Sequence, residues 1–94
     1  MDIELPTDDQ RPAFLQLADA VRGAIARDNA PPGTPLPAVR SLALRVGLHA
    51  NTVLHAYREL ARQGIVESRR GQGTFVAQLP PAAAERRVLA DELA

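Results

Sequence analysis

Hydrophobic residues recur along the chain at spacings that predict three helices. The first extends from about Pro12 to about Asn29, with an apolar stripe formed by Phe14, Leu17, Ala18, Val21 and Ile25. A second, shorter stripe in residues 38–46 ends at Gly47, a residue type that tolerates positive φ. A third runs from about Ala50 to Gln63 and is closed by Gly64. The pattern therefore favours a mainly helical chain.

Prolines and glycines separate these helices from a predicted β-hairpin. The four prolines within residues 31–37 exclude helix there and indicate a stiff connector. The β-prone runs 65–68 and 74–77 bracket a loop that contains two glycines, which is typical of a hairpin. Residues 82–93, after Pro80 and Pro81, favour helix by propensity, but so short a helix needs a packing partner. The expected fold is mainly α with a small β-hairpin.

The turn between the second and third helices has the composition of a helix-turn-helix. Ala43 supplies a small side chain where the two helices cross, and Gly47 supplies the turn. Apolar residues lie before, within and after the turn, at Leu42, Val46, Leu48, Val53 and Ala56. From this spacing alone, an ordinary αα-hairpin of a small bundle stays open as the alternative.

The third helix is predicted to be buried on one side and rich in hydrogen-bond donors on the other. Its inward face is expected to hold Val53, Ala56, Tyr57, Leu60 and Ala61. Asn51, His55, Arg58 and Arg62 fall within an arc of about 60° on the opposite face. Such groups suit base edges and phosphates in a major groove. We assign His49, Asn51, Thr52 and His55 to the groove and Arg58 to phosphate, whereas Arg62 fits a structural role at the helix end.

Charge is distributed unevenly, although the formal net charge of the chain is zero. Residues 36–77 carry six arginines against two acids, a balance of +4, and the flanking segments are acidic. This indicates a local anion-binding surface, with a solvated helix face as the alternative. Arg40, in the first turn of the second helix, is placed to reach a phosphate or a guanine, and a surface ion pair is its alternative role.

The loop between the two β-prone runs raises a separate question about its glycines. A nucleotide-binding glycine loop lies between a strand and a helix, but here a strand-like segment follows. The glycines therefore indicate a tight hairpin turn and leave room for backbone to approach a groove. The predicted contacts from this loop are Arg69, Arg70, Gly71, Gln72 and Gly73. A plain hairpin without DNA contact is the alternative.

Other functional classes find little support in the sequence. There is no cysteine, and His49 and His55 do not converge on one side of a helix, so no metal site, catalytic residues or cofactor are predicted. No apolar run is long enough to cross a membrane, and no signal peptide opens the chain. We therefore expect a cytoplasmic, non-enzymatic protein.

Four segments together resemble the DNA-binding domain of the GntR family of transcription regulators, in its YtrA-like form. PGTPLPAVRSLA at residues 32–43 resembles the family signature, and NTVLHAYREL at residues 51–60 resembles its recognition helix. GIVESRRGQGTFV at residues 64–76 resembles its wing, and PAFLQL at residues 12–17 resembles the entry to its first helix. Ala50 and His55 stand where many relatives carry other residues, so the bases that would be read stay open.

The resemblance implies a winged helix-turn-helix that binds an inverted-repeat operator as a homodimer in the bacterial cytoplasm, most commonly as a repressor. Its predicted contacts come from Arg40, from the start of the third helix including Ala50, and from the glycine loop. We expect residues 1–77 to form the DNA-binding domain and residues 78–94 a linker with a short helix, either the start of a further region or the end of a short family member. A winged helix used for protein–protein contact is the alternative function.

Overall fold

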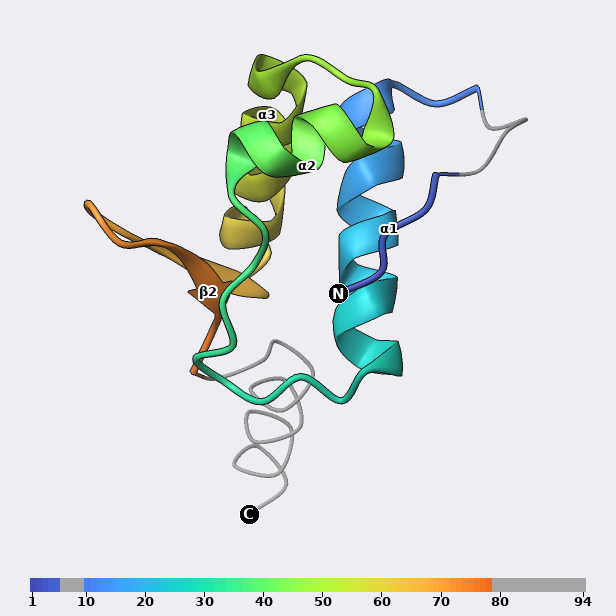
Figure 1. Cartoon of the computed structure of the whole chain (residues 1–94). Coiled ribbons are helices and arrows are strands. Elements are labelled where there is room, and N and C mark those ends of the chain that lie inside the picture. Colours follow the sequence, from blue (N-terminus) through green and yellow to red (C-terminus); the bar gives the residue numbers. More distant parts are fainter. Residues whose placement is uncertain (6–9, 79–94) are drawn as a thin grey trace.

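The computed structural model describes residues 1–5 and 10–78, which form three helices followed by a two-stranded hairpin. The helices are α1 (Ala13–Arg27), α2 (Val39–Val46) and α3 (Ala50–Arg62), and the strands are β1 (Val66–Arg69) and β2 (Gly73–Val76) (Figure 1). The mainly α fold with a small hairpin is confirmed, with each strand bound one residue away from the predicted one. The helix predicted for residues 82–93 lies outside the described residues.

The three helices enclose an aliphatic core, because α1 and α2 both pack against α3. Its fully buried large side chains are Leu17, Leu42, Leu60, Val21 and Val53. Burying one such side chain contributes roughly 1.5–3 kcal/mol to folding. Ala43 is buried at the crossing of the two helices, as predicted. Ala61 is exposed instead of buried, because it borders an open hollow between α3 and the hairpin.

Backbone geometry at the helix ends follows the glycines. Gly47 has φ 71°, and the N–H of Leu48 behind it donates to the carbonyl of Ala43 at 3.0 Å. Gly64 has φ 79°, and Ile65 N–H closes the last turn of α3 on the carbonyl of Leu60. Residues with a side chain rarely adopt these positive φ values. The two glycines therefore set the angle between α2 and α3 and the start of the hairpin.

The proline connector does more than join α1 to α2, because it lies along β2 as a third, irregular strand. Pro35 forms an isolated bridge with Phe75, and Gly33 N–H donates to the carbonyl of Val76 at 2.8 Å. Leu36 N–H donates to Thr74, also at 2.8 Å. The pairing satisfies the outer edge of β2, an edge that would otherwise carry unpaired polar groups. This pairing was not predicted from the sequence.

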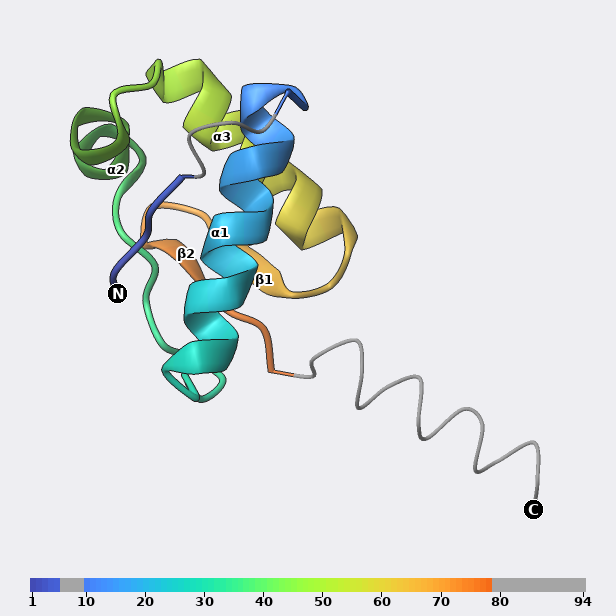
Figure 2. The same ribbon diagram turned by 90° about the vertical axis from the view of Figure 1, so that its right-hand side faces the viewer.

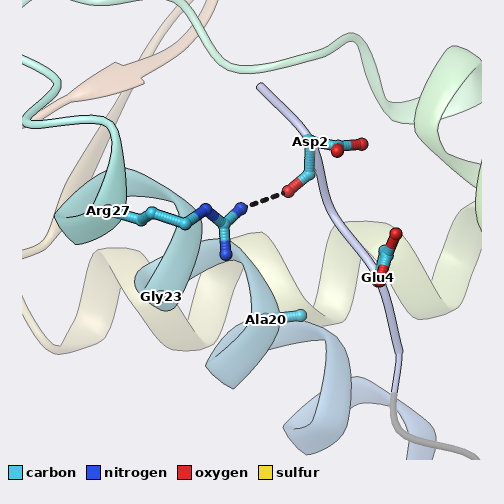
Figure 3. A pocket seen from close by; sticks show the side chains of 5 residues that line it. All are labelled: Asp2, Glu4, Ala20, Gly23 and Arg27. Atoms are coloured by element: carbon cyan, nitrogen blue, oxygen red, sulfur yellow. Dashed lines mark hydrogen bonds between the residues drawn. The ribbon is translucent and has the colours of Figure 1, made fainter.

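The N-terminal residues 1–5 lie against α1, where Ile3 is buried at 7% exposure. Arg27 donates to the backbone carbonyl of Asp2 at 2.6 Å, and Arg45 donates to that of Met1 at 2.9 Å. Figure 3 shows the Arg27 side chain pointing toward Asp2. The two residues line a hollow of about 350 Å³, together with Gly23 and Glu4. This seam holds the start of the chain and is formed by none of the predicted contact residues.

Candidate nucleic-acid interface

The polar edge of α3 is exposed along its length. Asn51, His55, Arg58 and Arg62 are all exposed, while Val53, Ala56, Tyr57 and Leu60 are buried on the other side. Figures 1 and 2 show α1 and the hairpin on opposite sides of the molecule, and α3 packs against both α1 and β1. The edge therefore has α1 on one flank and the hairpin on the other.

His55 is held in place by a side chain of the first helix. Its ring stacks on Phe14 with centroids 3.7 Å apart and planes 6° apart. A hollow of about 280 Å³ lies beside this stack, between the start of α1 and α3, and Asn51 and Thr52 also line it. The stack covers one face of the imidazole and leaves the ring edge, which carries both nitrogens, free to hydrogen-bond outward.

The start of α3 lies next to the start of α2. A hollow of about 380 Å³ joins the two and is lined by Arg40, Ala43, Leu44, Leu48, His49 and Ala50. No side chain caps the N-terminus of α3, because His49 makes no capping hydrogen bond. Thr52 and Val53 donate their N–H groups to the carbonyl of His49, whereas those of Ala50 and Asn51 have no acceptor among the described residues. These two are available to an outside acceptor, and the helix dipole favours an anion there.

Tyr57 fixes the chain just before Arg40. Its hydroxyl donates to the backbone carbonyl of Pro37 at 2.6 Å. Burial raises the pKa of Tyr57, so the hydroxyl keeps its proton and remains a donor. This bond ties the entry of α2 to α3 and so sets where the Arg40 side chain leaves the surface.

The hairpin tip has the backbone that its glycines predict. Gly71 has φ 74° and Gly73 has φ 120°, and Gln72 N–H closes the turn on the carbonyl of Arg69 at 2.9 Å. The Arg69 guanidinium lies 4.4 Å from the centroid of the Phe75 ring and donates to Glu67 at 3.0 Å. Arg69 is thus already engaged within the hairpin, whereas its exposed neighbour Arg70 makes no hydrogen bond or ion pair with residues 1–5 or 10–78.

The arginines divide into two groups by their contacts. Within residues 1–5 and 10–78, six of them bond to other parts of the chain: Arg11, Arg22, Arg27, Arg45, Arg62 and Arg69. The other three, Arg40, Arg58 and Arg70, make no hydrogen bond or ion pair with any described residue. These three lie on α2, on α3 and at the hairpin tip, and all three are predicted contact residues.

Arg62 belongs with the engaged group, as a structural role would require. It donates to both carboxylate oxygens of Glu59, at 2.6 and 3.0 Å. The hydrogen bond from Arg62, followed by one from Gln63, lowers the pKa of Glu59 to about 2. Glu59 is therefore ionised at neutral pH and offsets the Arg62 charge at the end of α3.

Together, a helix-turn-helix formed by α2 and α3 and a hairpin that projects beside it define a winged helix-turn-helix. A sequence profile described as "Bacterial regulatory proteins, gntR family" matches residues 14–76. The chain belongs to the GntR family, which is a family of regulators and not of enzymes.

Known relatives extend this assignment. The chain is 44% identical over 68 residues to the uncharacterized HTH-type transcriptional regulator YhcF of Bacillus subtilis, a match that covers 72% of the chain and 56% of YhcF. It is 34% identical over 76 residues to the transcriptional repressor YtrA of the same organism, covering 81% of the chain and 58% of YtrA. The chain thus spans a little more than half of each relative.

A solved structure supports the fold directly. The DNA-binding domain of AraR in complex with operator ORE1 matches with a TM-score of 0.69 and 26% identity, over 82% of the chain and 94% of that domain. The predicted resemblance to the GntR family, including its YtrA-like members, is confirmed.

The structure brings Asn51, Thr52 and His55 to one hollow and Arg40, His49 and Ala50 to another, and it places residues 69–73 at the hairpin tip. Sequence reasoning missed three features of these sites. It did not foresee that Phe14 supports His55, that Glu67 and Phe75 engage Arg69, or that Leu54 is exposed beside Arg58. The first two depend on contacts between elements, which periodicity does not report. The exposure of Leu54 could have been predicted from the sequence, because Leu54 stands outside the apolar stripe of α3.

Within the described parts of the chain, the structure contains no helix that is long and apolar enough to cross a membrane. The same residues contain no group of three or more His, Cys, Asp or Glu side chains that would hold a metal ion.

Proposed function

We propose that this chain binds double-stranded DNA through α3, the start of α2 and the hairpin tip. In this proposal α3 enters the major groove with His49, Ala50, Asn51, Thr52 and His55 facing base edges. The hairpin tip meets the neighbouring minor groove, where Gly71 and Gly73 let the backbone approach closely. The operator complex of the structurally similar AraR domain supports this choice of partner.

The observation that carries the proposal is the placement of the three unpaired arginines. Arg40, Arg58 and Arg70 stand at the three elements that would meet a duplex, and no acidic side chain of the described residues neutralises them. Arginines held for fold stability would bond to neighbours, as Arg22 and Arg27 do. A guanidinium left free is ready for a phosphate or the edge of a guanine.

We further propose that the chain acts as a homodimer on an inverted repeat and represses transcription in the bacterial cytoplasm, in association with the nucleoid. A single domain of this size offers a small footprint, and two half-sites about one helical turn apart supply both affinity and symmetry. The name of the related YtrA, a transcriptional repressor, supports the sign of regulation. A winged helix that served only for protein–protein contact would not need unpaired arginines on three elements.

Selection of bound sites from random duplexes, followed by titration of the selected duplex in increasing salt, tests the proposal. For DNA binding, log K falls with log salt by about 0.9 per phosphate neutralised. We expect Arg58→Ala to lower that slope by about 1. Arg62→Ala is the matched control, because Glu59 already neutralises Arg62, and its slope should equal that of the wild type. The protein–protein alternative is favoured if no sequence is enriched and if log K for any duplex changes little with log salt.

A further inference from the structure

Two large hydrophobic side chains are exposed in the described residues, and one of them lies on the DNA-facing helix. Leu44 on α2 is 85% exposed and Leu54 on α3 is 37% exposed. At 100° per residue, Leu54 stands about 60° from Asn51 and about 40° from Arg58 around α3. It therefore borders the polar edge of the helix on the side of the hairpin.

The surroundings of Leu54 open toward the same side. A hollow of about 230 Å³ between α3 and the hairpin is lined by Leu54, Tyr57, Arg58, Ala61, Ser68 and Thr74. Ala50, one helical turn before Leu54, is only half-buried and continues the apolar strip toward the start of α3. Ala50 and Leu54 stand about 40° apart around α3, and Leu54 is the one of the two that lies next to the polar edge.

We propose that Leu54 is a specificity-determining residue that contacts the C5-methyl group of a thymine in the operator half-site. The proposal rests on the proposed function and specifies which base Leu54 contacts and through which group of that base. In the major groove thymine alone among the four bases presents a methyl group, and apolar side chains are the contacts that read it. Asn51 lies one turn before Leu54 and Arg58 one turn after it, both on the same side around α3. A duplex bound by these two side chains would also cover Leu54 and remove its exposed surface from water.

The alternative is that Leu54 only supports the hairpin through the hollow beside Tyr57 and Thr74. The two roles differ in one measurable respect. A packing residue affects stability and affects every duplex alike, whereas a methyl-reading residue affects the difference between thymine and uracil. Deoxyuridine removes only the methyl group and leaves the hydrogen-bonding edge intact.

The experiment uses the full chain and its selected duplex, with each thymine of one half-site replaced in turn by deoxyuridine. Loss of one buried methyl contact corresponds to about a fourfold rise in Kd. We expect this penalty at one thymine for the wild type, and its disappearance in Leu54→Ala. Leu54→Met keeps an apolar side chain of similar reach and should retain it. Leu44→Ala, the same change at the exposed leucine of α2, is the matched control and should retain it too.

The outcomes separate this inference from the function it rests on. If the wild type selects no duplex, the proposed DNA binding itself fails. If a duplex is bound but no replacement of thymine by deoxyuridine raises Kd, Leu54 does not contact a thymine methyl group. The same conclusion follows if Leu54→Ala shows the full rise in Kd. Equal weakening of thymine and uracil duplexes, together with a lower melting temperature of Leu54→Ala, would assign Leu54 to hairpin packing alone.

Discussion

Replacing Arg40 by alanine tests the assignment of a DNA contact to the start of α2. Arg40 is exposed and makes no hydrogen bond or ion pair with any described residue, so its removal breaks no such bond of the fold. Alanine is at least as good a helix former, and surface changes of this kind leave stability within about 0.5 kcal/mol. Any loss of affinity in Arg40→Ala therefore reports on the complex and not on folding.

The size of the expected loss follows from what the guanidinium can bind. A good bidentate contact to a base discriminates by about 1–3 kcal/mol. At about 1.4 kcal/mol for each tenfold change, Kd should rise roughly 5-fold to 150-fold per half-site. A phosphate contact would also lower the salt slope by about 1, whereas a guanine contact would relax specificity at one base pair.

Fluorescence anisotropy with the selected duplex measures both quantities, with thermal melts of each variant as the folding control. Arg62→Ala removes an arginine that Glu59 already pairs, so its Kd should stay within about twofold of the wild type. If Arg40→Ala binds as the wild type does while Arg62→Ala loses affinity, then the unpaired arginines are not the contact residues.

Three further predictions concern the elements that position this surface. Gly73→Val should weaken DNA binding more than it lowers the melting temperature. Valine is strained at φ 120°, which changes the backbone of the hairpin tip, while its Cβ meets nothing within 4 Å and so disturbs no packing of the fold. An equal loss in both assays would show that Gly73 matters only for folding. Tyr57→Phe should cost about 1 kcal/mol in the urea-derived free energy of unfolding, since it removes the hydroxyl that bonds to Pro37; an unchanged value would deny that bond a role. The pKa of Glu59 is lowered from 4.5 to about 2. The ionised Glu59 side chain therefore contributes fully to stability above pH 4.5, and this contribution is lost as the pH falls toward 2. Glu59→Gln should therefore show a smaller loss of stability between pH 5 and pH 2, and a pH profile identical to the wild type would contradict this.

The local pattern of the sequence was sufficient for the helices and the turn between them. Periodic apolar residues and the placement of Gly47 report the 3.6-residue repeat and a left-handed backbone, which are properties of short stretches of chain. The same holds for Gly71 and Gly73 at the hairpin tip. Their effects do not depend on distant partners, so they can be predicted without a structure.

Contacts between segments that are distant in sequence could not be predicted from such local patterns. The connector was expected to be stiff, but its pairing with β2 depends on backbone groups of Gly33 and Leu36 that give no side-chain signal. The burial of Ile3 depends on α1 and α2, which are distant in sequence. The division between engaged and unpaired arginines likewise depends on which carboxylates and carbonyls the fold brings within reach, so charge counting along the chain could not reveal it.

The central claim is that the exposed edge of α3 and the hairpin tip together face DNA. Backbone amide chemical shifts of the isotope-labelled full chain, recorded with and without the selected duplex, test it most directly. We expect the largest changes at Asn51, His55 and Arg58 and at residues 70–73, with little change at Ile3 and Arg27 on the N-terminal seam. Changes confined to that seam, or no change with any duplex at low salt, would contradict the account.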